Sequence, residues 1–423
     1  MKKFYIKTLG CKTNAVESQI MAQNLKSKGF IEVLNKNEAD IYIINSCTVT
    51  SHSSNQVLYL LKQAKKENPY VKTVLTGCMA QAAIKKERDI DLILGNNEKL
   101  EVEKYIDYLF ETPLKRDGHI EFVQDIFEIK EYKNKIIHNS KSTRPSVKIQ
   151  DGCNNRCSYC LIPYVRGNSR SNTVDNIIKQ INIHTKEGKK EIVITGIHIG
   201  QWGNEFNLKL TDLLKEIEKT DIKRYRLGSL YINELDDKLF KFLTASKKFC
   251  PHFHLSLQSL TDKTLKNMNR FYTKKEVIDV VQRIKDNFNL PFIGCDIITG
   301  FPNETHEDFL ETKETLNMLK VSYIHSFPYS VRNGTKAASM ENQVLEHIKK
   351  ERTKELIELC KILHNEFLQA NKTTTREILY EKKGKNGLYK GISENYIKVY
   401  KKSDTNLQNT LESVSLTEFN ELY

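Results

Sequence analysis

Cys153, Cys157 and Cys160 lie in the segment CNNRCSYC, with three and then two residues between them. Thiols this close in one loop are too crowded for disulfide bonds and suit a single metal centre. A closed zinc site needs four ligands, and no fourth Cys or His lies near this segment. Three thiolates therefore favour an iron–sulfur cluster over structural zinc, with one iron left open for chemistry. The alternatives are an incomplete zinc ribbon and a chance grouping.

Cys11, Cys47 and Cys78 lie further apart, but each directly follows a predicted strand. Their spacing is close to that of one βαβ unit, about 30 residues. Because ligands of open α/β sheets bind at the carboxyl ends of strands, these three ends place three thiols on one rim. This predicts a second iron–sulfur cluster, again with an open iron. The alternative is three ordinary buried cysteines.

The elements that would position this second set alternate between strand and helix. Strands are predicted at 3–9, 40–45, 71–75 and 91–94, with helices at 16–28 and 54–66. Strands separated by helices of this length form right-handed crossovers and a parallel sheet. We therefore expect an N-terminal parallel α/β domain over residues 1–100. A charged connector, 101–143, would add a helix and an edge strand.

The loop with the first three cysteines belongs to a longer α/β repeat over residues 144–371. Strands are predicted at 146–150, 191–195, 224–229, 252–256, 292–298 and 323–329, with helices such as 174–187, 208–219, 274–287 and 345–369. This pattern indicates a curved parallel sheet, a partial or full (β/α) barrel, with the active site on the loops after the strands. Residues 372–423 show short strand-like runs with glycine turns, typical of a small β-barrel. The predicted fold class is α/β with this third, all-β domain.

Bulk composition narrows the class of protein. The 423 residues include 66 Lys and Arg against 53 Asp and Glu, a formal charge of +13 that favours a polyanion such as RNA as partner. The alternative is a lysine-rich composition without any patch. Nine cysteines, an odd number, indicate a reducing cytoplasm with metal ligands. Cys250, Cys295 and Cys360 are assigned no chemistry, and Cys295 and Cys360 are interpreted as packing residues. No signal-peptide core and no apolar run of about 18 residues is present, so we expect a cytoplasmic protein without a membrane partner.

Basic and tyrosine side chains alternate near the C-terminus. Residues 376–402 hold eight basic and three acidic side chains. The basic ones are Arg376, Lys382, Lys383, Lys385, Lys390, Lys398, Lys401 and Lys402, interleaved with Tyr380, Tyr389, Tyr396 and Tyr400. This pattern predicts phosphate contacts and base stacking on RNA. The alternative is solvated charge around a small barrel.

Both cysteine sets, in this order, resemble the methylthiotransferases, a branch of the radical S-adenosylmethionine (SAM) superfamily. The segments TLGCKTNAVES, residues 8–18, and TGIHIGQ, residues 195–201, look like the MtaB type of that branch. The resemblance implies an N-terminal methylthiotransferase domain, a radical SAM partial barrel and a TRAM-like RNA-binding barrel. It also implies an enzyme that adds a methylthio group to C2 of N6-threonylcarbamoyladenosine at position 37 of tRNA. The same chemistry on isopentenyladenosine tRNA or on a ribosomal-protein aspartate is the alternative.

The resemblance also implies two [4Fe–4S] clusters and SAM as cofactors. The cluster on Cys153, Cys157 and Cys160 would bind SAM through its open iron, and the cluster on the other set would hold the sulfur to be transferred. The partners would be the tRNA anticodon stem-loop, an electron donor and a sulfur donor. A rival class is a non-catalytic iron–sulfur RNA-binding protein, although structural clusters normally have four protein ligands.

Several side chains are expected around SAM. Tyr159 would pack under the adenine, and Gly196 would allow close approach near the methionine end. Strand-end residues would complete the site: Ser256 and Gln258 at the ribose, and Asp296 or Thr299 near the adenine. Each of these strand-end residues could instead cap its strand.

Arg166 and Arg170 follow the cysteine loop closely. They could clamp either the cofactor carboxylate or an RNA phosphate, because guanidinium groups bind both in a bidentate manner. The alternative is that both are surface charges.

Overall fold

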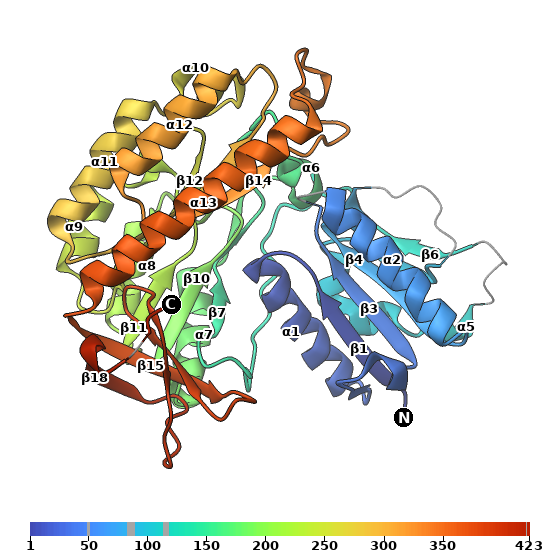
Figure 1. The fold of residues 1–423 in the computed structure, drawn as a ribbon. Coiled ribbons are helices and arrows are strands. Elements are labelled where there is room, and N and C mark those ends of the chain that lie inside the picture. Colours follow the sequence, from blue (N-terminus) through green and yellow to red (C-terminus); the bar gives the residue numbers. More distant parts are fainter. Residues whose placement is uncertain (49–50, 83–88, 113–117, 420) are drawn as a thin grey trace.

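The computed structural model describes residues 1–48, 51–82, 89–112, 118–419 and 421–423. Figure 1 shows three parts in chain order: an N-terminal α/β domain in blue, a large curved α/β domain from green to orange, and a small β domain in dark red. In the described residues, no helix is long and apolar enough to cross a membrane.

The N-terminal domain is built on a six-stranded, all-parallel sheet of order β2-β1-β3-β4-β5-β6. Its strands are β1 (Lys3–Thr8), β2 (Ile31–Glu32), β3 (Ile41–Ser46), β4 (Lys72–Gly77), β5 (Leu92–Leu94) and β6 (Ile120–Phe122). Its helices are α1 (Lys12–Ser27), α2 (Ser51–Glu67), α3 (Cys78–Gln81), α4 (Val102–Tyr105) and α5 (Tyr108–Glu111). The predicted parallel sheet is confirmed. Strand β6 lies in the predicted connector and forms the expected edge.

Side-chain alternation explains why helices cover both faces of this sheet. Ile41 and Ile43 face a core shared with α1 and α4, whereas Tyr42 and Ile44 face α2. Because all of these positions are buried, the strands have continuous apolar runs, as expected for a parallel sheet covered on two sides.

The central domain has two three-stranded parallel sheets, β7-β10-β11 and β12-β13-β14, which isolated parallel bridges next to β11 and β12 join into an open barrel. The strands are β7 (Ser146–Lys148), β10 (Glu191–Thr195), β11 (Arg224–Leu227), β12 (His252–Gln258), β13 (Phe292–Thr299) and β14 (Tyr323–Pro328). A short antiparallel pair, β8 (Gln150–Asp151) and β9 (Arg170–Ser171), follows β7. Strands β7 and β14 are the two edges, so of the two predicted forms the partial barrel is correct.

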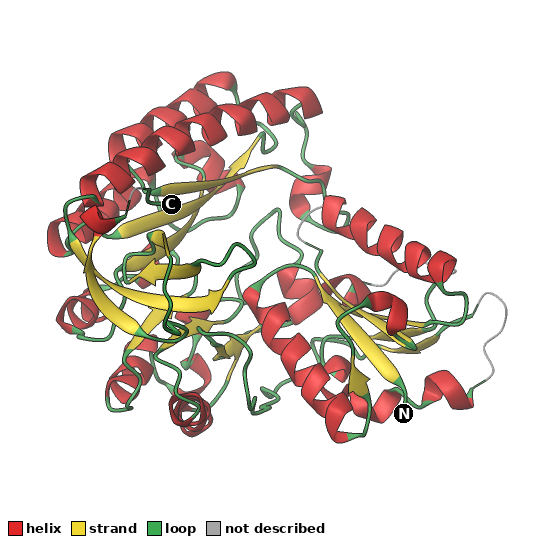
Figure 2. Ribbon diagram, turned by 60° about the horizontal axis from the view of Figure 1, so that its bottom comes forward, coloured by secondary structure: helices red, strands yellow, loops and turns green. Residues whose placement is uncertain are grey.

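Helices lie on the outer, convex side of this curved sheet (Figure 2). They are α7 (Val174–Lys186), α8 (Leu210–Glu218), α9 (Asp237–Ala245), α10 (Asp262–Asn267), α11 (Lys274–Asn287), α12 (His306–Leu319) and α13 (Glu346–Asn371). The short helix α6 (Ile162–Arg166) instead lies between the barrel and the N-terminal domain, where it contacts α3 (Figure 1). Along β12, Phe253, Leu255 and Leu257 point into the core beneath the helices. The intervening His254 and Ser256 are less buried and point to the concave side. The concave side is therefore polar and accessible, which suits a binding site.

The C-terminal domain is an antiparallel sheet of order β17-β16-β15-β18. Its strands are β15 (Thr375–Lys383), β16 (Tyr389–Ser393), β17 (Lys398–Lys401) and β18 (Leu411–Ser415). Arg224 and Arg226 of β11, both paired with the buried Glu191, donate to the backbone carbonyls of Ile392 and Ser393. These charge-assisted bonds join the small domain to the barrel.

Candidate active site

The first three cysteines occupy the loop between β8 and α6. Gly152 begins this loop with φ of +74°, and a Cβ there would collide with the backbone oxygen of Asn168, so only glycine fits. Burial, together with the nearby sulfur of Cys157, raises the pKa of Cys153 to about 11 and that of Cys160 to about 12. Loading iron would therefore have to displace thiol protons.

Two polar side chains from elsewhere in the barrel reach these sulfurs. Nδ1 of His198 lies 3.4 Å from Sγ of Cys153, and its Nε2 pairs with Glu234. Nη1 of Arg270 lies 3.5 Å from Sγ of Cys157. The Arg270 guanidinium also stacks on a tyrosine ring, Tyr231, at 3.9 Å. Sequence reasoning misses the roles of all four, and the only signal near them is the segment 195–201, which includes His198.

Two of the predicted SAM-binding residues are tied to this loop: Tyr159 belongs to it, and Ser256 is joined to Cys157 through Arg270. The ring of Tyr159 contacts Phe301 edge-on, with centroids 6.5 Å apart. The backbone oxygen of Ser256 accepts a hydrogen bond from Nη2 of Arg270 at 2.5 Å. Gln258 ends β12 in a bulge with φ of +66°, a rare conformation for a residue other than glycine. Strained backbone of this kind is common at functional sites.

Asp296 and Thr299 are separated, although both belong to β13. Asp296 lies on the concave side, where its carboxylate is 3.0 Å from Nε2 of His254. Thr299 points to the convex side, and its hydroxyl is 2.7 Å from that of Thr353 on α13. Since alternate residues of β13 face opposite sides of the sheet, Asp296 is the better candidate for a cofactor contact than Thr299. Both assignments remain predictions.

Strand register brings the other three cysteines to one edge of the N-terminal sheet. Thr8 of β1 pairs with Asn45 of β3, and Ser46 pairs with Gly77 of β4. The residues that follow, including Cys47 and Cys78, therefore leave the sheet side by side. A Cβ on Gly10 would lie 2.7 Å from Cβ and 2.9 Å from Sγ of Cys47, so the backbone before Cys11 is in close contact with this thiol.

In the described part of the chain, no three His, Cys, Asp or Glu side chains are arranged to share one metal ion. A [4Fe–4S] cluster makes a different demand, because each thiolate binds its own iron. The grouping of each set of three thiols, at one loop or at one sheet edge, is compatible with that demand, and both ligand sets remain predictions.

A cavity of about 470 Å³ lies where the three domains meet. Cys11 and Lys12 line it from the N-terminal domain, Gly196 from the barrel, and Tyr396 and Lys398 from the C-terminal domain. Its volume is in the range of ordinary ligand sites. The predicted cofactor residue Gly196 thus shares one cavity with a cysteine of the second set.

The structure corrects the roles considered for Arg166 and Arg170. Both are buried, with exposed fractions of 0% and 6%. Arg166 pairs with Glu17, and both arginines lie near Asp151. They are therefore neither surface charges nor available to an RNA phosphate.

Part of the predicted RNA surface is also wrong. Tyr380 and Tyr389 belong to the apolar core of the C-terminal domain, because alternate positions of β15 and β16 point inward. Arg376 is 5% exposed and donates to Asn371 at 2.7 Å. The basic residues that remain exposed are Lys382, Lys383, Lys385 and Lys402.

An open six-stranded parallel barrel with a CxxxCxxC loop beside its first strand defines the radical SAM class of protein. The profile described as the Radical SAM superfamily matches residues 147–316, and that described as Uncharacterized protein family UPF0004 matches residues 3–95. The solved structure of TsrM from Kitasatospora setae, a radical S-adenosylmethionine methyltransferase, has a similar fold. Its TM-score is 0.56 at 12% identity, covering 80% of this chain and 77% of that one.

Curated relatives extend this similarity over nearly the whole chain. Threonylcarbamoyladenosine tRNA methylthiotransferase MtaB of Aquifex aeolicus is 39% identical, covering 94% of this chain and 96% of the relative. The Bacillus subtilis protein of the same name is 34% identical over 93% and 88%. tRNA-2-methylthio-N(6)-dimethylallyladenosine synthase of Clostridium botulinum is 33% identical over 91% and 87%. The chain belongs to the radical SAM tRNA methylthiotransferases, enzymes that use a [4Fe–4S] cluster and SAM.

Proposed function

We propose that this enzyme adds a methylthio group to C2 of N6-threonylcarbamoyladenosine at position 37 of tRNA. The observation that carries the choice of substrate is the set of nitrogen donors that line the cavity. Among the described residues, its lining includes Lys12, Lys398 and four histidines, and no Asp or Glu. The histidines are His252, His254, His325 and His364. Burial lowers the pKa of three of its imidazoles, those of His252, His325 and His364, so these act as neutral N–H donors beside the lysines.

This lining suits an anionic substituent on the adenine. The threonylcarbamoyl group ends in a carboxylate, which N–H donors bind through charge-assisted hydrogen bonds. The isopentenyl group of the alternative substrate is apolar and would leave the same donors desolvated without partners. The cavity therefore favours the threonylcarbamoyl substrate.

Lys12 is the cavity residue best placed to bind the carboxylate. It directly follows Cys11, and it is exposed to solvent at the cavity. Desolvation by the cavity walls lowers the pKa of Lys12, and the positive charges of Arg144 and Arg226 also lower it. A bound carboxylate would oppose these effects and favour the charged ammonium.

Each cysteine set would then serve one part of the reaction. Cys153, Cys157 and Cys160 would hold the cluster that binds SAM, with His198 and Arg270 beside the sulfurs. When bound, these cofactors supply the one-electron chemistry that an sp² carbon requires and that no side chain offers. Cys11, Cys47 and Cys78 would hold a second cluster that carries the sulfur. Since Cys11 lines the cavity, this sulfur would lie next to the adenine.

The test compares two tRNA substrates in vitro, one with N6-threonylcarbamoyladenosine and one with isopentenyladenosine. We expect the 2-methylthio product only from the first, measured by mass spectrometry of digested nucleosides. Lys12→Gln should lower kcat/KM on that substrate by roughly 10- to 100-fold, because a charged hydrogen bond is removed. The control is Lys241→Gln on the exposed side of α9, which should match the wild type. Methylthiolation of the isopentenyl substrate alone would contradict the proposal.

The C-terminal domain is proposed to contact the anticodon stem-loop. Lys390 and Lys401 pair with Glu381 and Glu412, which leaves the four exposed lysines named above for phosphate contacts. Electron and sulfur donors complete the proposed set of partners.

Replacing Lys382, Lys383, Lys385 and Lys402 together by glutamine should weaken tRNA binding and leave SAM cleavage intact. The log–log salt slope should flatten by about 0.7–0.9 for each phosphate that the variant no longer neutralises. Both quantities come from binding isotherms at several salt concentrations. Neutralising four exposed lysines on the outer side of the barrel is the control: Lys241, Lys247, Lys266 and Lys275. An equal effect in the two variants would show a non-specific charge effect and no role for the small domain.

A further inference from the structure

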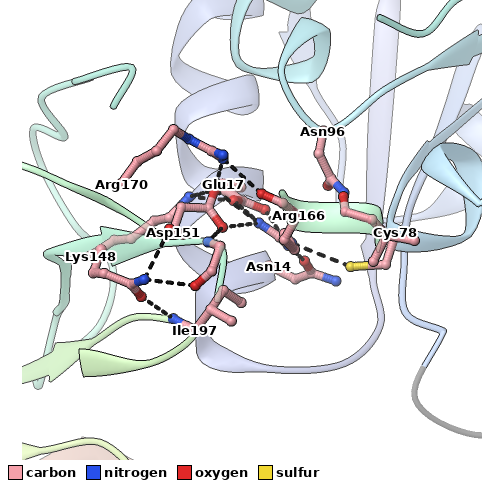
Figure 3. Close-up of polar contacts among 12 residues, drawn as sticks. Asn14, Glu17, Cys78, Asn96, Lys148, Asp151, Arg166, Arg170 and Ile197 are labelled. Carbon is pink, nitrogen blue, oxygen red and sulfur yellow. Dashed lines mark hydrogen bonds and ion pairs between the residues drawn. The ribbon is translucent and has the colours of Figure 1, made fainter. Parts of the chain in front are cut away.

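Arg166 links the two cysteine sets. It is the last residue of α6, six positions after Cys160, and it is fully buried. Its Nε donates to Sγ of Cys78, 3.4 Å away in the N-terminal domain (Figure 3). A side chain that directly follows the loop of the first set thus contacts a cysteine of the second set.

The guanidinium is held in place from both domains. Its Nη1 donates to Oε1 of Glu17 at 2.5 Å and lies 3.3 Å from Oδ1 of Asp151. Its Nη2 donates to Oδ1 of Asn14 at 2.5 Å. Figure 3 shows Glu17 and Asp151 on one side of Arg166 and Cys78 on the other. With all three nitrogens engaged, Arg166 has one orientation, in which Nε points at the sulfur.

The surrounding charges favour an anionic sulfur at Cys78. Glu17 and Asp151 are the carboxylates of this buried group. Four cations contact them: Lys99, Lys148, Arg166 and Arg170. Buried charges are costly unless they are balanced. A thiolate bound to iron would supply part of the missing negative charge, and the Cys78 thiol is the sulfur within reach of Arg166.

We propose that Arg166 is a positioning residue that orients the Cys78 ligand and raises the reduction potential of the second cluster. The inference rests on the proposed function, because it takes Cys11, Cys47 and Cys78 as cluster ligands. Hydrogen bonds to ligand sulfurs and nearby charge are among the main determinants of iron–sulfur potentials. A positive N–H donor stabilises the more negative, reduced state. The potential of the second cluster therefore depends on a residue of the radical domain.

The experiment uses the full chain with Cys153, Cys157 and Cys160 replaced by alanine, so that iron on the second set alone is observed. Redox titration followed by electron paramagnetic resonance gives its midpoint potential. Arg166→Gln should lower the ratio of reduced to oxidised cluster at a fixed potential by roughly tenfold, a shift of about 59 mV for one electron. Arg166→Lys keeps the charge without the N–H···S bond and should give a smaller shift in the same direction.

Arg156→Gln is the matched control, because Arg156 lies in the same loop but donates to the backbone of Cys153 and to Asn168 instead. It should leave the potential unchanged. A folded, iron-loaded Arg166 variant with an unchanged midpoint potential would overturn the inference, and lower thermal stability alone would assign Arg166 a structural role. If Arg166→Gln does not fold, Arg166→Lys is measured in its place, and its smaller downward shift supports the inference while an unchanged potential overturns it. Absence of any cluster in the parent chain would instead overturn the proposed function.

Discussion

The variant with Cys153, Cys157 and Cys160 all replaced by alanine is expected to lose reductive cleavage of SAM. The loss should be roughly 10⁶-fold or more, the lower end of enzymatic accelerations. The loop contributes all three thiols. Of the two side chains that contact them, the Arg270 guanidinium does not bind iron, and the single imidazole of His198 cannot hold a cluster alone. The measurement is 5′-deoxyadenosine formed under strong reductant, quantified by liquid chromatography.

Cys295→Ala is the control for removing a cysteine from the same domain. Cys295 is fully buried on β13, where its thiol donates to the backbone oxygen of Tyr323 at 3.7 Å, away from both cysteine sets. This variant should keep its iron and its cleavage activity. Cleavage at the wild-type rate by the triple variant would show that SAM is not activated at the 153–160 loop.

Replacing Cys11, Cys47 and Cys78 by alanine should lower the iron content of reconstituted enzyme from about eight to about four atoms per chain. Methylthiolation of tRNA should fall to background, while 5′-deoxyadenosine formation continues. The reason is spatial: these cysteines follow β1, β3 and β4 of a separate sheet, whereas SAM is proposed to bind in the barrel. Iron analysis and nucleoside mass spectrometry on one preparation measure both effects.

The triple variant also removes the sulfur partner of Arg166, because it replaces Cys78. Its effect therefore combines the loss of the cysteine set with the loss of this contact. Cys11→Ala alone avoids this problem, since Cys11 is the exposed member of the set. It should also abolish methylthiolation while SAM cleavage persists. Unchanged iron in the triple variant would remove the second cluster from the proposal. Loss of SAM cleavage in folded Cys11→Ala enzyme would refute the division of roles between the two sets.

The strands are predictable because their signals are local. The sequence predicts strands at 191–195 and 292–298, and the structure has Glu191–Thr195 and Phe292–Thr299. The predicted helix at 274–287 is found at Lys274–Asn287, where Thr273 and Glu276 form a capping box. The predicted strand 146–150 is less accurate, because the chain leaves β7 after Lys148 and pairs with β9 instead.

The roles of charged and aromatic side chains are harder to predict. The sequence places Tyr380 and Tyr389 on the RNA surface, but both are part of the apolar core of the C-terminal domain. Arg270 has no signal in the sequence, since its partners Cys157 and Ser256 become neighbours only when the barrel curves. Composition and spacing cannot distinguish a buried cation from an exposed one.

The sequence by itself determined the fold class, the parallel direction of the strands and the family. These follow from periodicity and short motifs, which are properties of residues close together in the chain. Only the tertiary structure decided which groups meet. Arg166 and Glu17 are 149 residues apart, and Arg166 and Cys78 are 88 apart. Lys12 and Lys398 share a cavity from opposite ends of the chain. Such contacts depend on how three domains pack, and packing is set by the shape and charge of whole surfaces.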